Sequence, residues 1–276
     1  MKLSDKRLIK DYLAVVSIIG LLITFTIKLL DVSGKYKGAT GVVGLILVLL
    51  TLYIILWIRA NFLNIVKMKI NNSIIEVKIG DIFEENELKV IAFNEYFDTL
   101  VDNKVISNKT LNGLYLIDFV ENVNELDSLI NADEHLNDTI LESNSSRLSG
   151  KKKKYKLGTV FQHNDYLLTA FSRFDKDNRA YLNINDYINF LINFWNEIDI
   201  VYAGRSISIP LLGSGITRFK EYDMISEQEL LELLIWSFKV SRIKFTYPSQ
   251  VSIVIHESKK DKINFYKLRG VENGFK

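Results

Sequence analysis

Apolar residues are concentrated near the N-terminus of the chain. Residues 12 to 30 carry no charge before Lys28, and residues 39 to 58 form a second uncharged run after a polar link from Asp31 to Gly38. At about 1.5 Å per residue, roughly 20 helical residues cross the hydrocarbon layer of a bilayer. The pattern therefore predicts a two-helix transmembrane hairpin, residues 1–62, with spans at about 12–30 and 39–58.

Basic residues predict the orientation of this hairpin. They precede the first run at Lys2, Lys6, Arg7 and Lys10 and follow the second at Arg59, Lys67 and Lys69, whereas the link holds Lys35 and Lys37. Lys and Arg are retained on the cytoplasmic side, so both termini are expected there. A cleavable signal peptide is the main alternative, but its apolar core is usually shorter and no small-residue cleavage site follows the first run.

From residue 65 onward the pattern changes to that of a water-soluble domain, residues 65–276. Alternating apolar runs flank Asn71 and Asn72, which indicates a β-hairpin, and residues 87–94 read as a buried strand. Further strands are expected at YKLGTVFQ, YLLTAFSR, SISIPLL and VSIVIHE, and helices at 112–131, 184–200, 226–239 and 259–269. Because strands and helices alternate, we expect an α/β fold whose mixed sheet has helices on both faces.

The amino-acid composition excludes several classes of function. The net charge is only +2, which gives no case for nucleic-acid binding, and the absence of cysteine excludes disulfides, thiol catalysis and zinc-thiolate sites. The polar run 133–154 ends in four lysines and is expected to be a mobile surface loop. The alternative is that Lys151 to Lys154 contact anionic lipid headgroups.

The most informative segment for function is SISIPLLGSGITRF, residues 206–219, where an apolar strand runs into a Gly-Ser-Gly turn. Such a turn can direct consecutive amides at phosphate oxygens, although an isolated Gly-x-Gly is more often an ordinary turn. Ligands of open α/β sheets bind at the carboxyl ends of strands. Asn94, at the end of the early strand, and Gly213 to Gly215 are therefore expected to line one crevice.

These segments resemble a macro domain, the module that binds ADP-ribose and its derivatives. The resemblance rests on Gly80-Asp81-Ile82, the strand that ends at Asn94, ISIPLLGSGI, and VIHE at 254–257, over roughly residues 65–270. With the preceding hairpin, FNEYFDT and LGTVF, the whole chain is similar to the membrane-anchored macro-domain effectors of bacterial Thoeris anti-phage systems. The resemblance implies a macro-domain-like mixed sheet flanked by helices.

The resemblance also implies a set of ligand-binding residues. Asp81 would accept a hydrogen bond from the adenine amino group beside the Ile82 amide, and the loop 213–216 would hold a diphosphate. Arg218 and Phe219 would contact the distal portion of the ligand, and His256 would place a ring against adenine; the alternative for His256 is a strand histidine bonded to a neighbour. The full set is Asp81, Ile82, Asn94, Thr110, Asn112, Gly113, Gly213, Ser214, Gly215, Ile216, Thr217, Arg218, Phe219 and His256.

One departure from the family bears on catalysis. Hydrolytic macro domains have Asn-Ala-Ala-Asn followed by a glycine run, whereas this chain has Ile91-Ala92-Phe93-Asn94 and then Glu-Tyr-Phe-Asp-Thr. The closest substitute is SNKTLNG, residues 107–113, where Thr110, Asn112 and Gly113 could offer a helix N-terminus to an anion. We therefore expect binding rather than hydrolysis, with no catalytic residues and no metal site.

The leading hypothesis is an anti-phage defence effector in the bacterial inner membrane. Its ligand would be an ADP-ribose derivative, with an amino-acid conjugate as one option, and no cofactor is expected. The resemblance implies that a partner TIR-domain protein makes this signal, and that binding drives the hairpins to assemble as a homo-oligomer and disrupt the lipid bilayer. The alternatives are a membrane-tethered ADP-ribose hydrolase and a protein-binding scaffold that takes no nucleotide.

Overall fold

The computed structural model describes residues 3–30, 39–220 and 225–268. Contacts divide the chain into two units, Met1–Val66 together with Asn264–Lys276, and Lys67–Ile263. The chain therefore passes between the units twice, at Val66–Lys67 and again at Ile263–Asn264. The predicted division at residues 62 to 65 stays a prediction.

The first unit is helical, with α1 (Lys6–Leu30), α2 (Ala39–Asn61) and the short α8 (Phe265–Leu268). Among the described residues, one segment, Val43–Asn61, is long and apolar enough to span a membrane by length and composition. It covers most of the second predicted span. The first predicted span, residues 12–30, stays a prediction, and the predicted link at 31–38 lies outside the described residues.

The base of the helical unit is held together by its C-terminal segment. Tyr266 packs with Leu8 of α1 and Ala60 of α2, and its hydroxyl donates a hydrogen bond to the Asp11 carboxylate. The tail Asn264–Leu268 thus contacts the first turns of α1 and the last turn of α2.

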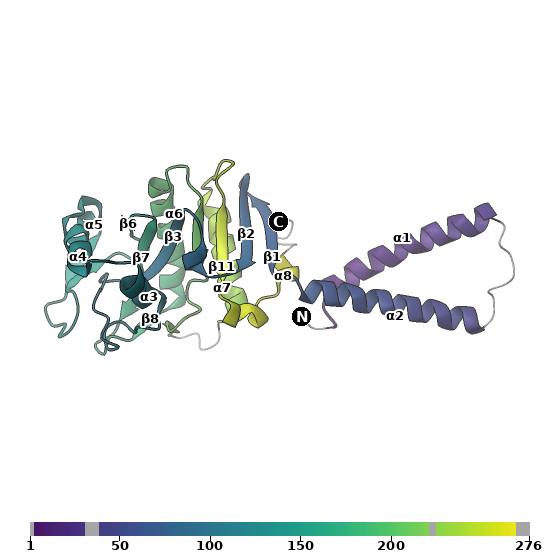
Figure 1. The fold of residues 1–276 in the computed structure, drawn as a ribbon, viewed down its shortest axis with the longest axis horizontal. Coiled ribbons are helices and arrows are strands. Elements are labelled where there is room, and N and C mark those ends of the chain that lie inside the picture. The colour runs from purple at the N-terminus through teal and green to yellow at the C-terminus, as the bar shows by residue number, and fades with distance from the viewer. Residues whose placement is uncertain (1–2, 31–38, 221–224, 269–276) are drawn as a thin grey trace. The chain divides into compact units, whose positions relative to one another are not determined.

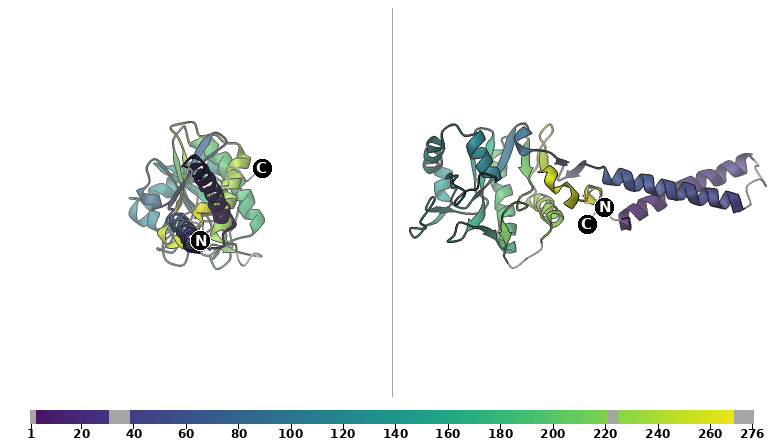
Figure 2. Two further views of the ribbon diagram at one scale, coloured as in Figure 1. Left: turned by 90° about the vertical axis from the view of Figure 1, so that its right-hand side faces the viewer. Right: turned by 60° about the horizontal axis from the view of Figure 1, so that its bottom comes forward.

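The second unit is built on a mixed β-sheet (Figure 1; Figure 2 gives further views). Within the described residues nine strands form it, in the order β1-β2-β11-β9-β3-β7-β8-β10, with β6 paired to β7. They are β1 (Ile65–Ile70), β2 (Ser73–Ile79), β3 (Leu88–Asn94), β6 (Val160–His163), β7 (Tyr166–Phe174), β8 (Ala180–Leu182), β9 (Ile207–Pro210), β10 (Arg218–Phe219) and β11 (Val251–Ile255). Strands β2, β11, β9, β3 and β7 are mutually parallel, whereas β6 and β8 run antiparallel to β7.

The predicted hairpin at Asn71 and Asn72 is confirmed. The two residues have φ of 52° and 66°, and positive φ at both central positions defines the type I′ turn that suits the twist of paired strands. Asparagine tolerates this conformation better than most residues. The turn therefore joins β1 to β2 directly.

Helices cover both faces of the sheet, as predicted (Figures 1 and 2). On one face, α6 (Ile184–Val201) and α7 (Glu227–Ser241) pack through aromatic rings, with Trp195 and Phe238 4.9 Å apart. On the other, α3 (Leu111–Asp118) and α4 (Val123–Ala132) pack over Leu168 and Ala170 of β7. Successive residues of a strand point to opposite faces, so Phe171 turns instead to Phe190 of α6.

The run 133–154, expected to be a mobile loop, has defined structure. It forms α5 (Glu134–Asp138), β4 (Ile140–Ser143) and β5 (Lys153–Tyr155), with β4 and β5 paired. Arg147 binds the fully buried Asp98 through both carboxylate oxygens, and this pair fastens the segment to the end of β3. The expectation from polar composition was wrong because one buried acid supplies an anchor.

The lysines of that segment are largely engaged within the domain. Lys151 pairs with Asp127 at 2.6 Å, and Lys154 pairs with Glu142 at 3.0 Å and Glu95 at 3.7 Å. Lys153 donates to the Asn137 side chain. These contacts argue against the lysines acting as a lipid-binding cluster.

Candidate functional site

Several predicted site residues lie at one edge of the sheet. Gly80 and Asp81 follow β2, His256 follows β11, the loop from Gly213 follows β9, and Asn94 ends β3. Because these strands are parallel, their carboxyl ends share an edge. Strands β2 and β9 both pair with β11, so their ends are separated by about 10 Å, two strand spacings.

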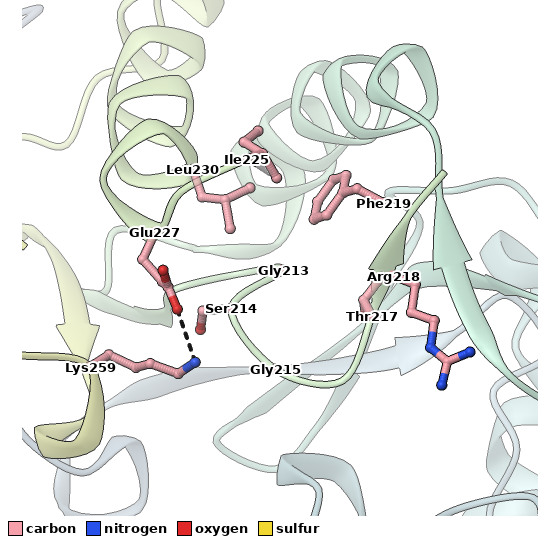
Figure 3. A pocket seen from close by; sticks show the side chains of 10 residues that line it. All are labelled: Gly213, Ser214, Gly215, Thr217, Arg218, Phe219, Ile225, Glu227, Leu230 and Lys259. Atoms are coloured by element: carbon pink, nitrogen blue, oxygen red, sulfur yellow. Dashed lines mark hydrogen bonds and ion pairs between the residues drawn. The ribbon is translucent and has the colours of Figure 1, made fainter. Parts of the chain in front are cut away.

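A cavity of about 410 Å³ opens beside the loop that follows β9 (Figure 3). Part of its wall is the Gly-Ser-Gly turn and the strand after it, and the rest comes from the start of α7 and from the turn after β11. Its lining residues are Gly213, Ser214, Gly215, Thr217, Arg218, Phe219, Ile225, Glu227, Leu230 and Lys259. Six of the fourteen predicted site residues are thus brought together around one cavity.

The turn that lines the cavity leaves main-chain donors unused. The amide and hydroxyl of Ser214 both donate to the Leu211 carbonyl, at 3.2 Å and 2.7 Å. In the part of the chain that the structure describes, the amides of Gly215, Ile216 and Thr217 donate to no protein group. Three successive free amides in a turn are a suitable binding site for an anion.

Two glycines of this turn have different surroundings. Gly213 has φ of +89°, and a Cβ there would lie 3.1 Å from the Phe219 ring, so the position requires glycine. At Gly215 a Cβ would meet no atom within 4 Å. The first glycine shapes the turn, and the second leaves space for a ligand.

A buried tyrosine holds the turn from the helix side. Tyr187 of α6 is fully buried and donates from its hydroxyl to the Leu212 carbonyl at 3.2 Å, while its ring meets Phe219 edge-on at 5.4 Å. Burial raises the pKa of this phenol well above its usual range, so it stays protonated as a donor. Sequence reasoning missed Tyr187 because no local pattern marks a helical tyrosine as a partner of a distant loop.

An ion-pair cluster forms the other side of the cavity. Glu227, at the first position of α7, accepts from Lys259 at 3.0 Å and from Lys262 at 2.7 Å (Figure 3 shows the first pair). Partial burial raises the pKa of Glu227, but the hydrogen bonds from Lys262 and Lys259 outweigh it and lower the pKa to about 2. Arg218 projects on the opposite side of the turn from Lys259.

Asp81 and Ile82 form a short turn at the edge of the site. The exposed Asp81 carboxylate accepts from the Phe83 amide at 2.9 Å and so caps the 3₁₀ turn η1 (Ile82–Glu84), while the Ile82 side chain is buried. A carboxylate has capacity for more than one donor. Asp81 is therefore able to keep its cap and still accept from a ligand.

His256 is exposed and caps η2 (Glu257–Lys262), where its Nδ1 lies 2.8 Å from the Ser258 hydroxyl. It also accepts from the Ser258 amide at 3.3 Å. This geometry supports the alternative that the histidine is bonded to a neighbour.

Asn94 is committed to the turn that follows β3. Its side chain is buried, donates to Asp98 at 3.1 Å and accepts from the Tyr96 amide at 2.9 Å. Asp98 in turn is held by Arg147. Asn94 ends the strand beside β9, but its hydrogen-bonding groups are engaged within the protein.

The predicted anion site at the start of α3 is partly closed. Thr110 caps the helix and accepts from the Gly113 amide at 3.3 Å, so that amide already has a partner. A Cβ on Gly113 would lie 2.2 Å from the Ser107 carbonyl oxygen. Thr110, Asn112 and Gly113, together with Asp81, Ile82, Asn94, Ile216 and His256, are not lining residues of the cavity in Figure 3.

Residues 75–256 match the family described as "Thoeris protein ThsA, Macro domain". The chain is also 42% identical over 275 residues to "Thoeris protein ThsA" of Bacillus amyloliquefaciens (strain Y2), covering 97% of this chain and 91% of that protein. The chain belongs to the ThsA family. The predicted resemblance is confirmed at this level, and with it the macro-domain type of α/β fold.

Solved macrodomains are more distant from this ThsA chain. The Oceanobacillus iheyensis macrodomain with MES bound is 15% identical, with a TM-score of 0.47 over 76% of this chain and 97% of that one. The same macrodomain with ADP is 13% identical, with a TM-score of 0.45 over 76% and 95%. A mutant of it with ADPR is 14% identical, with a TM-score of 0.44 over 76% and 97%.

The described part of the ThsA chain contains no group of three or more His, Asp and Glu side chains that could hold a metal ion. The absence of catalytic residues stays a prediction.

Of the residues that sequence reasoning missed, only Glu227 carried a local signal, since it follows the capping serine Ser226 at the start of α7. That signal placed the helix and not the cavity.

Proposed function

We propose that this ThsA chain binds an ADP-ribose-type nucleotide in the cavity beside the Gly213–Thr217 turn. The observation that carries the proposal is the group of free amides at Gly215, Ile216 and Thr217 in a turn that lines a cavity of about 410 Å³. Small-molecule sites usually measure roughly 300–1,000 Å³. A diphosphate would accept from these amides, with Arg218 at hand as a counter-charge.

We assign the adenine end of the nucleotide to Asp81. It follows β2, at the same edge of the sheet as the turn after β9 and about two strand spacings away. That separation suits a ligand with a base at one end and a diphosphate in the middle. Macrodomain relatives with ADP and with ADPR are in keeping with this choice of ligand.

Binding without turnover is the activity that we propose. Asn94 stands where hydrolytic macro domains have the last residue of their Asn-Ala-Ala-Asn motif. It is buried and hydrogen-bonded to Asp98 and to the Tyr96 amide. This engagement supports a structural role for it. Release of ADP-ribose from an ADP-ribosylated substrate by the purified protein would overturn this part of the proposal in favour of the hydrolase.

The wider role that we propose is a defence effector. The helical hairpin spans the bacterial inner membrane twice with both termini in the cytoplasm, a partner TIR-domain protein supplies the nucleotide, and occupied chains assemble and disrupt the bilayer. A ligand can drive this change only if it binds one assembly state more tightly than the other. Dye release from vesicles that carry the full chain, with and without the TIR protein's product, tests the role.

Calorimetry on the full chain in detergent, titrated with ADP-ribose, tests the binding site. Gly215→Glu introduces a negative side chain at a position with open space, so we expect affinity to fall by about tenfold or more without loss of folding. Asn189→Glu, on the exposed side of α6, is the control for the added charge. Equal affinity in wild type and Gly215→Glu would refute the assignment.

A second pair of variants tests the adenine contact. Asp81→Asn keeps an oxygen for the Phe83 amide but replaces the other acceptor by a donor, which opposes the adenine amino group. We expect it to weaken binding while the melting temperature stays near that of the wild type. Asp81→Ala removes the cap as well, so a loss of affinity only in Asp81→Ala would indicate a structural role instead.

A further inference from the structure

The segment that follows β11 links the candidate site to the helical unit along the chain. It begins with η2 (Glu257–Lys262), crosses the unit boundary at Ile263–Asn264 and ends in α8 (Phe265–Leu268). Only two residues separate η2 from α8. Because this linker is short, a displacement of η2 is expected to move the tail Asn264–Leu268 as well.

One end of this segment is fastened to the cavity wall. Lys259 lines the cavity and pairs with Glu227, and Lys262 pairs with the same carboxylate oxygen of Glu227. Lys259 is the more buried of the two lysines, at 27% exposed against 54%. Glu227 thus holds η2 at two points, and Figure 3 shows the one at Lys259, in the wall of the cavity.

The other end is fastened to the base of the hairpin. Asn264 donates to Asp5, the residue that caps α1 through the amides of Arg7 and Leu8. Tyr266 donates to Asp11, and Arg7 donates to the Lys267 carbonyl at 2.9 Å. We call these three contacts of the tail the clasp.

We propose that η2 and the tail form the coupling element between cavity and hairpin, a mechanism that rests on the nucleotide binding proposed above. Glu227, Lys259 and Lys262 act as positioning residues, and the clasp holds the hairpin base in its resting arrangement. Occupation of the cavity by an anion loosens the clasp.

Charge explains why an anion would act on this element. A diphosphate in the cavity attracts Lys259 and repels Glu227, which are paired at 3.0 Å in the free protein. The ligand therefore competes for one of the two lysines that hold η2. Removing the negative charge of Glu227 should weaken the same attachment without any ligand.

Hydrogen exchange on the full chain in nanodiscs tests the coupling in the absence of nucleotide. We expect Glu227→Gln to speed exchange of the Leu8 and Ile9 amides, which donate to Asp5, by about threefold, the order that one partly exposed ion pair supplies. Asp261→Asn removes an exposed carboxylate from η2 itself and should leave these amides unchanged. Amides of β3 report whether the domain remains folded.

Unchanged exchange at Leu8 and Ile9 in a folded Glu227→Gln protein would overturn the proposal. If Glu227→Gln fails to fold, Lys262→Gln, which breaks the pair outside the cavity, gives the same comparison. Glu227→Asp, which keeps the charge, should restore exchange toward the wild-type rate.

Hydrogen exchange measured in the presence of ADP-ribose distinguishes failure of this proposal from failure of the binding proposal. ADP-ribose should speed exchange at Leu8 and Ile9 in the wild type, whereas Tyr266→Phe should exchange rapidly from the start, respond little, and keep wild-type affinity in calorimetry. If the wild type fails to bind ADP-ribose, the proposed function fails and the nucleotide-free comparison still decides the coupling. If it binds but the Tyr266→Phe response equals that of the wild type, the coupling fails alone.

Discussion

Two glycines that the sequence predicted to bind ligand differ in what surrounds the missing Cβ. A Cβ at Gly113 would lie 2.2 Å from the Ser107 carbonyl oxygen, which is a backbone atom, whereas Gly215 has open space. We expect Gly113→Ala to lower the free energy of unfolding by roughly 1–3 kcal/mol, the cost of overpacking, and Gly215→Ala to change it by less than about 0.5 kcal/mol. Urea titration measures both, and equal values would contradict the reading of the two sites.

His135, on the surface of the domain, is expected to make the stability of the fold depend on pH. Its Nε2 lies 2.6 Å from Glu197, and this hydrogen bond raises the pKa of His135 above 6.5. A group whose pKa is raised on folding stabilises the fold fully below its unfolded pKa, and loses that contribution as the pH rises through the folded pKa. We expect His135→Asn to lower the melting temperature at about pH 5.5 and to have little effect at about pH 9.

A thermal melt of wild type and His135→Asn across this range decides the point. His163 serves as a contrast, because burial lowers its pKa. A His135→Asn effect that is the same at both pH values would show that the charged pair contributes nothing.

At the scale of single residues, the local sequence pattern identified the Gly-Ser-Gly turn but not the distant residues that line or contact the same site. Gly213 and Gly215 directly follow an apolar strand, so the ligand-facing role that we propose for their turn could be predicted from neighbouring residues in the sequence. Tyr187 reaches Leu212 across 25 residues, and Lys259 reaches Glu227 across 32. Neither contact can be predicted from the local sequence pattern, because these residues come together only when the sheet has folded.

At the scale of elements, the segment Asn144–Lys151 shows how one side chain can order a polar loop. The Arg147 guanidinium stacks on the Tyr96 ring at 4.0 Å and binds Asp98, which is 0% exposed. The amide of Lys151 also donates to Asp98, at 2.6 Å. The loop thus supplies Arg147 as the ion-pair partner of this buried carboxylate.

We expect Arg147→Met to lower the free energy of unfolding by about 3 kcal/mol or more, because it leaves Asp98 buried and uncompensated. Lys152→Met, a neighbouring exposed position, is the matched control and should have little effect. Chemical denaturation of both variants measures the difference. The double variant Arg147→Met with Asp98→Leu should recover part of the loss, since it removes the unpaired charge as well.

The elements themselves were predictable where pattern and contacts agree. The strand expected at 87–94 corresponds to β3, and the Asn71-Asn72 hairpin forms as predicted. The helix expected at 112–131 divides instead into α3 and α4, because Asn122 caps a new helix through the amides of Asn124 and Glu125. Periodicity continues across such a break, so it did not reveal the division.

At the scale of the whole molecule, the membrane role that we propose rests on the apolar surface of the helical unit. Leu47, near the middle of the second predicted span, is 58% exposed. We expect Leu47→Lys to oppose insertion by roughly 3 kcal/mol and to raise the fraction of chain that alkali extracts from membranes. Leu141→Lys, at an equally exposed position in the other unit, should extract like the wild type.

The clasp joins residues from opposite ends of the chain. Asp5 and Asp11 precede the whole macro domain, and their partners Asn264 and Tyr266 follow it, 259 and 255 residues later. During translation both helices are therefore synthesised before their hydrogen-bond partners in the clasp. If the clasp restrains the hairpin as we propose, a message cut short upstream of Asn264 would encode an unrestrained hairpin, and such truncations should harm the cell more than deletion of the gene.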